Sequence, residues 1–308
     1  MIPLKNTKAI SVNSIGFLFA LASACLFAIR PIFVKLVYAE GIDPSTLIAF
    51  RMLFSAPIYA AMLYFLMRQS ELRNKITKKA VASSAFIGLF GYYAASFLDL
   101  VGLQYVTAQL GRMILYIYPT LTVILGAILF REHISLRTII CLIVTYIGVA
   151  IIFGHDLQYF GKQLYVGAAF IIGSALSFAI YLIYSKPLIS QLGSRTFTCI
   201  ALLSASTGIF IHYAVTHSLM SPQVNTVGLF WILIIAIFCT VIPSFFTTAA
   251  VARIGANKTG IVAMVGPGVT SIFAVLILDE LFSIYHALGI VITVAGVWYL
   301  HQEKAKAN

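Results

Sequence analysis

The sequence predicts an all-α integral membrane protein in which ten transmembrane helices form two inverted-topology five-helix repeats. Three observations predict this fold class. First, 61% of the 308 residues are hydrophobic and only 9% are charged, against about 25% charged residues in an ordinary soluble domain. Second, the apolar residues gather in runs long enough to cross a bilayer. Third, the two halves of the chain repeat one another. Such a composition excludes a soluble enzyme, a disordered chain and a secreted disulfide scaffold.

The ten spans follow from the length of the apolar runs. A transmembrane helix needs about 20 mostly apolar residues, because its backbone must satisfy its own hydrogen bonds in hydrocarbon. The first run starts at Ile15 and is too long for the hydrophobic region of a signal peptide, so we expect a retained helix. The connections between runs are short, and Arg68–Lys79 is the longest. In order, the predicted spans are 15–37, 46–67, 80–101, 107–130, 135–153, 164–185, 196–216, 226–250, 257–278 and 284–301.

The basic residues predict the orientation of these spans. If the N-terminus is cytoplasmic, fifteen lysines and arginines between the spans fall inside and only Lys162 falls outside, which is a strong positive-inside bias. We therefore expect a multi-pass protein of the cell (inner) membrane with both termini in the cytoplasm. The net charge of +11 then reports topology rather than nucleic-acid binding, since the bases are spread over short segments. The acids predicted to lie outside are Glu40, Asp43, Asp156, Asp279 and Glu280.

A comparison of the chain with itself finds an internal repeat. Residues 16–35 match residues 167–186 at a shift of 151, and residues 105–150 match residues 253–298 at a shift of 148. Because each copy holds five helices, an odd number, the second copy is inverted relative to the first. Secondary transporters use such inverted repeats, with a site near mid-membrane between them. The predicted copies are residues 1–153 and 154–308.

Proline and glycine interrupt both copies at matching places. Tyr118-Pro119-Thr120 lies in the fourth span and Gly266-Pro267-Gly268 in the ninth. Proline removes a backbone donor and clashes with the preceding turn, so carbonyl groups become free there. We predict hinges beside the binding site at these positions; a packing kink without ligand contact is the alternative. The predicted hinge residues are Pro119, Gly266, Pro267 and Gly268, and close helix approach is expected at Gly88, Gly91 and Gly126.

Several motifs together resemble one transporter family. They are Tyr118-Pro119-Thr120, Phe130-Arg131-Glu132-His133-Ile134-Ser135 and Gly148-Val149 in the first copy, and Gly266-Pro267, Leu278-Asp279-Glu280 and Gly296-Val297 in the second. With Arg51 and the stretch 92–105, this pattern resembles the EamA branch of the drug/metabolite transporter superfamily. The resemblance implies a ten-helix exporter or exchanger that works by alternating access without ATP. It implies no particular substrate. Gly111 stands where an acid is usual in one bacterial subset, which leaves the charge partner of Arg112 open.

Charged residues inside the predicted spans are the candidate site. In the predicted topology they all fall toward the outer side of the first four helices, and a charge at that depth costs at least about 2.5–3.5 kcal/mol unless it is paired or hydrated. One carboxylate cannot balance three arginines, and guanidinium groups bind carboxylate or phosphate in a bidentate way. We therefore expect a small anionic or zwitterionic metabolite as substrate. The five residues are Arg30, Lys35, Arg51, Asp99 and Arg112.

Helical spacing of three, four and seven residues adds polar and aromatic side chains on the same faces. Three alternatives stay open for Asp99: it neutralises one of the arginines structurally, it couples transport to protons, or it contacts the ligand directly. For the tyrosines, packing alone is the alternative to lining the site. Glu132 and Glu280, at helix ends, are expected to be structural ends or gates. The predicted substrate-binding residues are Arg30, Tyr92, Ser96, Asp99, Gln109, Arg112, Tyr116 and Tyr181.

These features predict a secondary transporter and not an enzyme. Its partners would be the lipid bilayer, a small-molecule substrate and a proton or counter-substrate, with no nucleic acid. No cofactor and no metal site are predicted, because the six histidines show no HxxxH spacing and the four cysteines no CxxC spacing. An intramembrane enzyme would need paired carboxylates, a metal cluster or an activated nucleophile, and Asp99 is the only acid expected to be buried. A channel with an arginine-lined cavity is the other alternative.

Overall fold

The computed structural model describes residues 12–68, 76–131, 135–217 and 224–307, and these residues form helices and turns without a strand. In this part of the chain, nine helical segments are long and apolar enough to cross a membrane, and Ile284–Tyr299 is a shorter apolar helix. The predicted all-α membrane class is therefore confirmed. The shorter helix falls on the tenth predicted span.

The elements follow one another with few residues between them. In chain order they are α1 (Val12–Ala39), α2 (Pro44–Met67), α4 (Lys78–Gly88), η1 (Leu89–Ala94), α5 (Ala95–Leu103), α6 (Ala108–Leu115), α7 (Tyr118–Phe130), α8 (Leu136–Phe160), α9 (Gln163–Leu192), α10 (Ser194–Thr216), α11 (Thr226–Ala236), η2 (Ile237–Val241), α12 (Ile242–Ala263), α13 (Gly266–Leu278) and α14 (Ile284–Ala307).

Short polar residues start the helices where the chain re-enters the bundle. Asp43 accepts hydrogen bonds from the backbone N–H groups of Ser45 and Thr46 at the start of α2. Thr107 accepts one from the N–H of Leu110 at the start of α6. These side chains satisfy backbone donors that have no partner within the first turn of a helix.

Three irregularities of the first half recur 148 positions later. The π-helical turn η1 begins at residue 89, and η2 begins at residue 237. Pro119 is the second residue of α7 and Pro267 the second residue of α13, each after a break in the helix before it. Arg131 and Asp279 end α7 and α13 with φ angles of 54° and 52°. The shift found in the sequence is therefore also present in the backbone.

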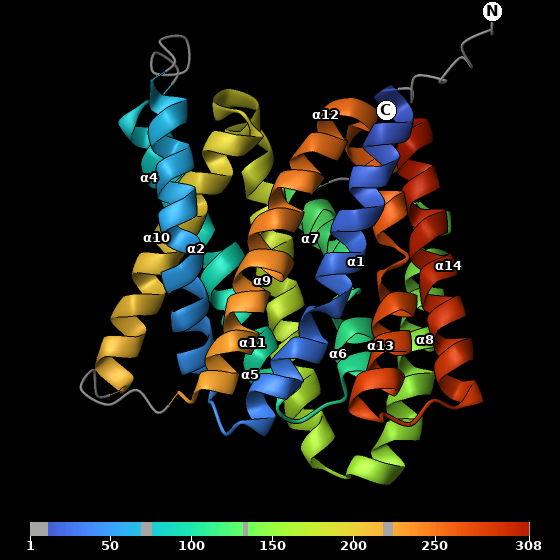
Figure 1. The fold of residues 1–308 in the computed structure, drawn as a ribbon. Coiled ribbons are helices and arrows are strands. Elements are labelled where there is room, and N and C mark those ends of the chain that lie inside the picture. The colour runs from blue at the N-terminus through green and yellow to red at the C-terminus, as the bar shows by residue number, and fades with distance from the viewer. Residues whose placement is uncertain (1–11, 69–75, 132–134, 218–223, 308) are drawn as a thin grey trace, which may run out of the picture.

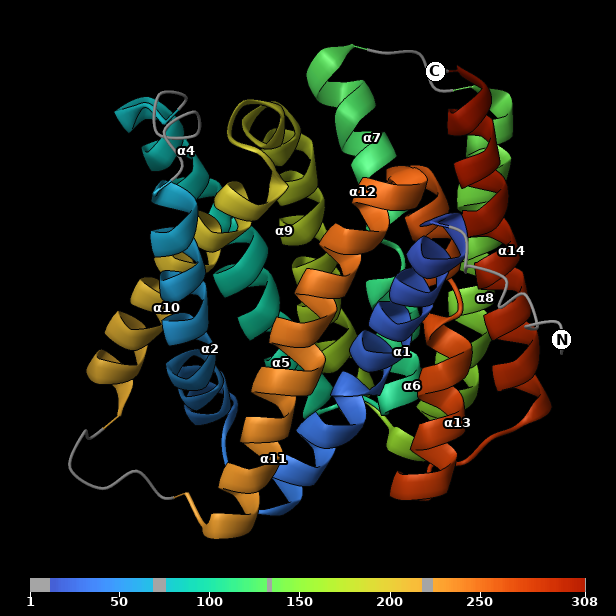
Figure 2. The same ribbon diagram turned by 45° about the horizontal axis from the view of Figure 1, so that its top comes forward.

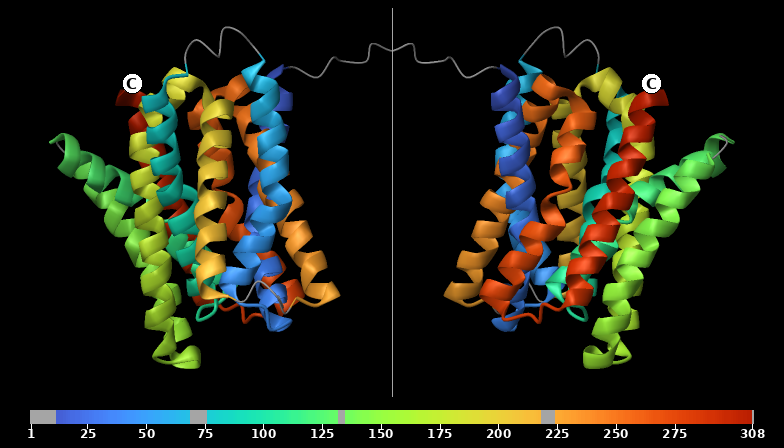
Figure 3. Two further views of the ribbon diagram at one scale, coloured as in Figure 1. Left: turned by 90° about the vertical axis from the view of Figure 1, so that its left-hand side faces the viewer. Right: turned by 90° about the vertical axis from the view of Figure 1, so that its right-hand side faces the viewer.

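Helices from the two halves interleave in one bundle (Figures 1 and 2). α1 packs on α12, α2 on α10, α5 on α9, and α8 on α14. The start of α1 and the end of α14 lie at one end of the bundle, which we call the terminal end. The α8–α9 turn and the segment joining α13 to α14 lie at the opposite end, the loop end (Figures 1 and 3).

Glycine permits two of the closest helix contacts. A Cβ at Gly88 would lie 2.5 Å from the carbonyl oxygen of Ala201 on α10, and a Cβ at Gly91 would overlap the ring of Tyr181 on α9. Gly126 was expected to act in the same way, but a Cβ there would meet nothing within 4 Å. That expectation is wrong, because α7 leans away from the bundle at this point (Figure 3).

The fifth span is longer than predicted. The sequence predicted its end at residue 153 and placed Asp156 in the outer connection, but α8 continues to Phe160 and Asp156 is 2% exposed. The helix can continue because the Asp156 carboxylate finds hydrogen-bond partners inside the bundle, which offsets the penalty of burying it. The expectation that Asp99 is the only buried acid is therefore wrong.

Candidate functional site

An ion pair joins α1 to α5 inside the bundle. The Arg30 guanidinium donates through Nη2 to Oδ2 of Asp99. The two side chains are 17% and 6% exposed, so the pair is largely removed from solvent. The sequence left three arginines open as partners of Asp99, and the structure selects Arg30.

Arg112 on α6 lies beside the break between α6 and α7. Its guanidinium carbon is 5.4 Å from the centre of the Tyr116 ring, which is a cation–π distance. The Tyr116 hydroxyl donates to the carbonyl oxygen of Ala263, the last residue of α12, at 2.5 Å. A Cβ at Gly266 would collide with this hydroxyl, so glycine is required there. The two matching helix breaks therefore meet beside Arg112.

Three arginines in this region keep unused hydrogen-bond donors. Arg51 on α2 is 2% exposed, and both Arg30 and Asp99 act on its charge. Among the described residues, the Nε groups of Arg30, Arg51 and Arg112 are buried without a hydrogen-bond partner. Leaving a buried donor unsatisfied costs about 1–3 kcal/mol, and more for a charged group. The region therefore favours a bound acceptor, above all an anion.

A small cavity lies between Arg30, Asp99 and Arg112, and Arg51 is not part of its lining. Its volume is about 10 Å³, which is room for about one water molecule. A metabolite does not fit, so the arginine cluster is closed in this conformation. The lining residues are Arg30, Pro31, Asp99, Leu103, Gly111, Arg112 and Leu115.

A larger cavity of about 580 Å³ lies elsewhere, between α2, α10 and α12. Its lining comes from residues 58–66 of α2, from Arg195 in the first turn of α10 and from residues 245–249 of α12. Its described lining is apolar apart from Arg195, with Met62, Phe245 and Phe246 among its walls. Because this lining offers one charge and little hydrogen bonding, we place the polar site at the arginine cluster and not here.

The other predicted site residues lie outside the arginine cavity. The Tyr181 hydroxyl donates to that of Tyr92 at 3.1 Å, and their rings pack edge to face between η1 and α9. Ser96 is half-buried on α5. Gln109 is 1% exposed, and its Nε2 donates to the carbonyl oxygen of Leu281 at 3.2 Å. Tyr92, Tyr181 and Gln109 are therefore hydrogen-bonded to other residues of the bundle in this conformation.

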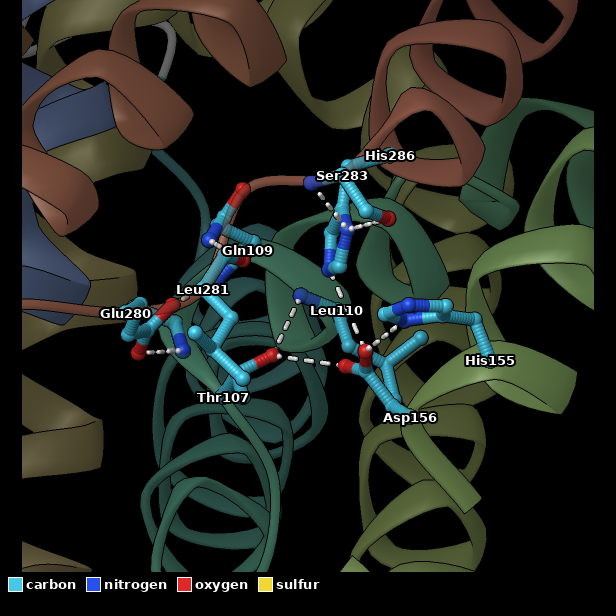
Figure 4. Close-up of polar contacts among 10 residues, drawn as sticks. Thr107, Gln109, Leu110, His155, Asp156, Glu280, Leu281, Ser283 and His286 are labelled. Atoms are coloured by element: carbon cyan, nitrogen blue, oxygen red, sulfur yellow. Dashed lines mark hydrogen bonds and ion pairs between the residues drawn. The ribbon is translucent and has the colours of Figure 1, made fainter. Parts of the chain in front are cut away.

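Carboxylates on α8 and on the segment after α13 meet the start of α6 at the loop end (Figure 4). Glu280 accepts hydrogen bonds from the N–H groups of Ala108 at 2.6 Å and Gln109 at 3.2 Å. Oδ2 of Asp156 accepts from the Thr107 hydroxyl at 3.2 Å. Negative charge at the start of a helix is favourable because the N–H groups there carry partial positive charge. Glu132, the counterpart of Glu280 in the repeat, lies outside the described residues.

Two histidines share the carboxylate of Asp156. Nδ1 of His155 lies 3.3 Å and Nε2 of His286 lies 3.1 Å from its Oδ1 atom. The sequence analysis missed this group because it assigned Asp156 to a connection and searched the histidines only for local spacing. His155 comes from α8 and His286 from α14, so only the packing of these two helices brings them together.

Comparisons with known proteins agree with the architecture. The model of the EamA-like transporter family matches residues 14–154 and again residues 165–301. The chain is similar to the uncharacterized transporter YcbK of Bacillus subtilis, at 25% identity over 89% of this chain and 88% of that protein. It is also similar to an uncharacterized transporter of Clostridium kluyveri, at 23% identity over 95% of each. A solved crystal structure shares the fold with a TM-score of 0.64 at 15% identity, covering 92% of this chain and 95% of its own.

Proposed function

The chain belongs to the EamA-like transporter family, and from this premise we propose that it is a secondary transporter of a small anionic or zwitterionic metabolite. The main support for an anionic substrate is the buried Nε donors of Arg30, Arg51 and Arg112. These three groups have no hydrogen-bond partner among the described residues. Asp99 supplies one negative charge against these three positive charges. A bound carboxylate or phosphate would satisfy the guanidinium donors and balance the remaining charge. In a zwitterion, the ammonium group would face Asp99.

Alternating access between the two halves, 1–153 and 154–308, is the mechanism we infer. It is supported by the family match in each half and by backbone breaks that recur at the same shift. The larger cavity lies between α2, α10 and α12, whereas contacts of Glu280 and Asp156 tie together the helices at the loop end. With both termini in the cytoplasm of a bacterial-type inner membrane, this conformation is closed to the outside. The hinges would be the breaks flanked by Pro119, Gly266, Pro267 and Gly268.

The substrate chemistry is tested first by ligand stabilisation. Purified protein in detergent is heated with a panel of monocarboxylates, dicarboxylates, amino acids, sugar phosphates and aromatic amines. We expect a carboxylate or phosphate to raise the unfolding temperature of the wild type and of Arg68→Ala, a matched control at the exposed end of α2. The same ligand should lose its effect in Arg112→Ala. Stabilisation by amines alone, or equal stabilisation of Arg112→Ala, contradicts an arginine site for anions.

Flux then separates a transporter from the two alternatives. With the stabilising ligand in proteoliposomes, a transporter gives saturable uptake that is accelerated by unlabelled ligand on the opposite side. A channel gives uptake without saturation or counterflow, and an enzyme returns a chemically altered ligand. Uptake of the same ligand under an imposed proton gradient tests the coupling species. If neither the wild type nor Asp99→Asn responds to the gradient, coupling through Asp99 is excluded and a counter-substrate drives transport.

Orientation is tested by cysteine labelling in a background without Cys25, Cys141, Cys199 and Cys239. Ala39 and Lys162 are exposed toward the loop end, and Lys78 is exposed at the start of α4. We expect an impermeant maleimide to label Ala39→Cys and Lys162→Cys in intact cells and to reach Lys78→Cys only after lysis. Labelling of Ala39→Cys and Lys162→Cys from different sides would overturn the topology.

A further inference from the structure

We infer that His155, Asp156 and His286 form a binding site for a zinc ion that bridges α8 and α14 at the loop end. This inference rests on the geometry of the three side chains and is independent of the transport proposal. All three point toward one another from two different helices, α8 and α14 (Figure 4). Imidazole nitrogen and carboxylate oxygen are the ligands that Zn²⁺ takes in proteins, and two histidines with one carboxylate leave a fourth position for water.

The spacing of the ligand atoms is close to that of a zinc site. Adjacent ligands of a tetrahedral ion with bonds of 2.0–2.2 Å lie about 3.3 Å apart. Oδ1 of Asp156 is 3.1 Å from Nε2 of His286 and 3.3 Å from Nδ1 of His155, so two edges already have this length. The three atoms lie within 4.8 Å of one another, so the remaining edge needs to shorten by at most about 1.5 Å. Rotation of the His155 ring, the most exposed of the three at 10%, provides this movement.

Neighbouring groups hold the ligands in place. In this structure the backbone N–H of Ser283 donates to Nδ1 of His286 at 3.2 Å, and the Ser283 hydroxyl oxygen lies 2.9 Å from the same atom. With zinc on Nε2, Nδ1 carries the ring proton and donates a hydrogen bond to the Ser283 hydroxyl oxygen in place of the bond from the N–H group. The Thr107 hydroxyl donates to the second oxygen of Asp156. Partners of this kind orient metal ligands and increase their basicity. The rings of Tyr285 and Tyr159 pack 5.1 Å from that of His155 and shield the group from water.

The charge of the cluster also favours a cation. The side chain of Asp156 is 3% exposed, and its ion-pair partners among the described residues are the two histidines. A buried carboxylate without a full positive charge beside it is unfavourable. A divalent ion bound by the three side chains supplies that charge. Because the ion would join α8 to α14, it would hold these two helices together at the loop end.

Zinc binding is measured on the full-length, tag-free protein in detergent after treatment with EDTA. A chromophoric chelator competes for Zn²⁺, and we expect one ion per chain and a rise in unfolding temperature that Mg²⁺ does not produce, since Mg²⁺ prefers oxygen ligands. Affinity should fall at least about tenfold in His286→Asn and in His155→Asn. His212→Asn is the matched control, because His212 contacts Tyr93 on another part of the bundle, and it should bind as the wild type does.

A second readout does not depend on stability. Co²⁺ takes the same nitrogen and oxygen ligands and absorbs strongly in the visible range when four-coordinate. We expect this absorption in the wild type and in His212→Asn, and its loss in His155→Asn. His155 is the most exposed of the three proposed ligands, so replacing it disturbs the packing least. Wild-type protein without that absorption, or zinc affinity equal in wild type and His286→Asn, would overturn the site.

Discussion

Replacing Asp99 by asparagine removes one negative charge from the interior while preserving the size of the side chain. In the wild type the carboxylate faces Arg30, and the pair is 6% and 17% exposed. Arg51, 2% exposed, is repelled by Arg30 and attracted by Asp99. Asp99→Asn therefore leaves Arg30 and Arg51, which repel each other, without the carboxylate that attracts both. Arg30→Gln leaves Asp99 with Arg51 as an alternative partner.

The two variants should therefore lose different amounts of stability, and Asp99→Asn should lose more than Arg30→Gln. Removing one member of a buried ion pair lowers the free energy of unfolding by about 3–5 kcal/mol, and we expect Asp99→Asn in that range. Arg30→Gln should lower it by about 1–3 kcal/mol, because it loses hydrogen bonds but also removes a repulsion. The double variant should be less destabilised than the sum of the two, with a coupling energy of about 1–3 kcal/mol.

Unfolding in mixed micelles with increasing SDS, followed by circular dichroism, measures these differences. Asp43→Asn serves as the control, because it makes the same chemical change on a side chain that is 44% exposed. If Asp99→Asn and Arg30→Gln lower the free energy of unfolding equally, the predicted difference between the two variants is refuted. Strict additivity of the double variant would refute the ion pair itself.

Three further predictions concern capping, packing and acid stability. Glu280→Gln should lower the unfolding free energy by about 1 kcal/mol, because a neutral amide replaces the charged acceptor at the start of α6; an unchanged value in the same SDS assay contradicts this. Gly88→Ala should lower it by about 1–3 kcal/mol through collision with Ala201, whereas Gly126→Ala, with open space, should be neutral or slightly stabilising; the reverse order of unfolding temperatures would show the contact to be misassigned. Partial burial raises the pKa of Asp43, but hydrogen bonds from Thr46 and the nearby His217 outweigh burial and hold that pKa below its usual value. Its stabilising contribution is therefore present above about pH 4 and lost as the pH falls further, so Asp43→Asn should show a shallower loss of unfolding temperature from pH 5 to pH 3.

Most of the fold could be predicted from the sequence because its causes are local. A run of about 20 apolar residues becomes a membrane helix wherever it lies in the chain. Proline is favoured in the first turn of a helix, and Pro119 and Pro267 stand there in α7 and α13. Proline alone does not mark a break, since Pro31, Pro57 and Pro187 lie inside continuous helices; the recurrence of the motif in both repeats identified these two. The end of α8 was predicted too early because its last turns contain His155 and Asp156, which look like connection residues until their partners on other helices are known.

The sequence by itself determined the class of membrane protein, the approximate spans, the internal repeat and the charges of Arg30, Arg51, Asp99 and Arg112 within the spans, since hydropathy and charge act over a few residues; it missed the buried Asp156. Only the tertiary structure decided that Arg30 rather than Arg51 or Arg112 pairs with Asp99, that Tyr92 and Tyr181 pack on each other, and that His155, Asp156 and His286 converge. Helical periodicity gives the face on which a side chain lies, but the partner it meets there depends on which helices pack together and on their relative rotation.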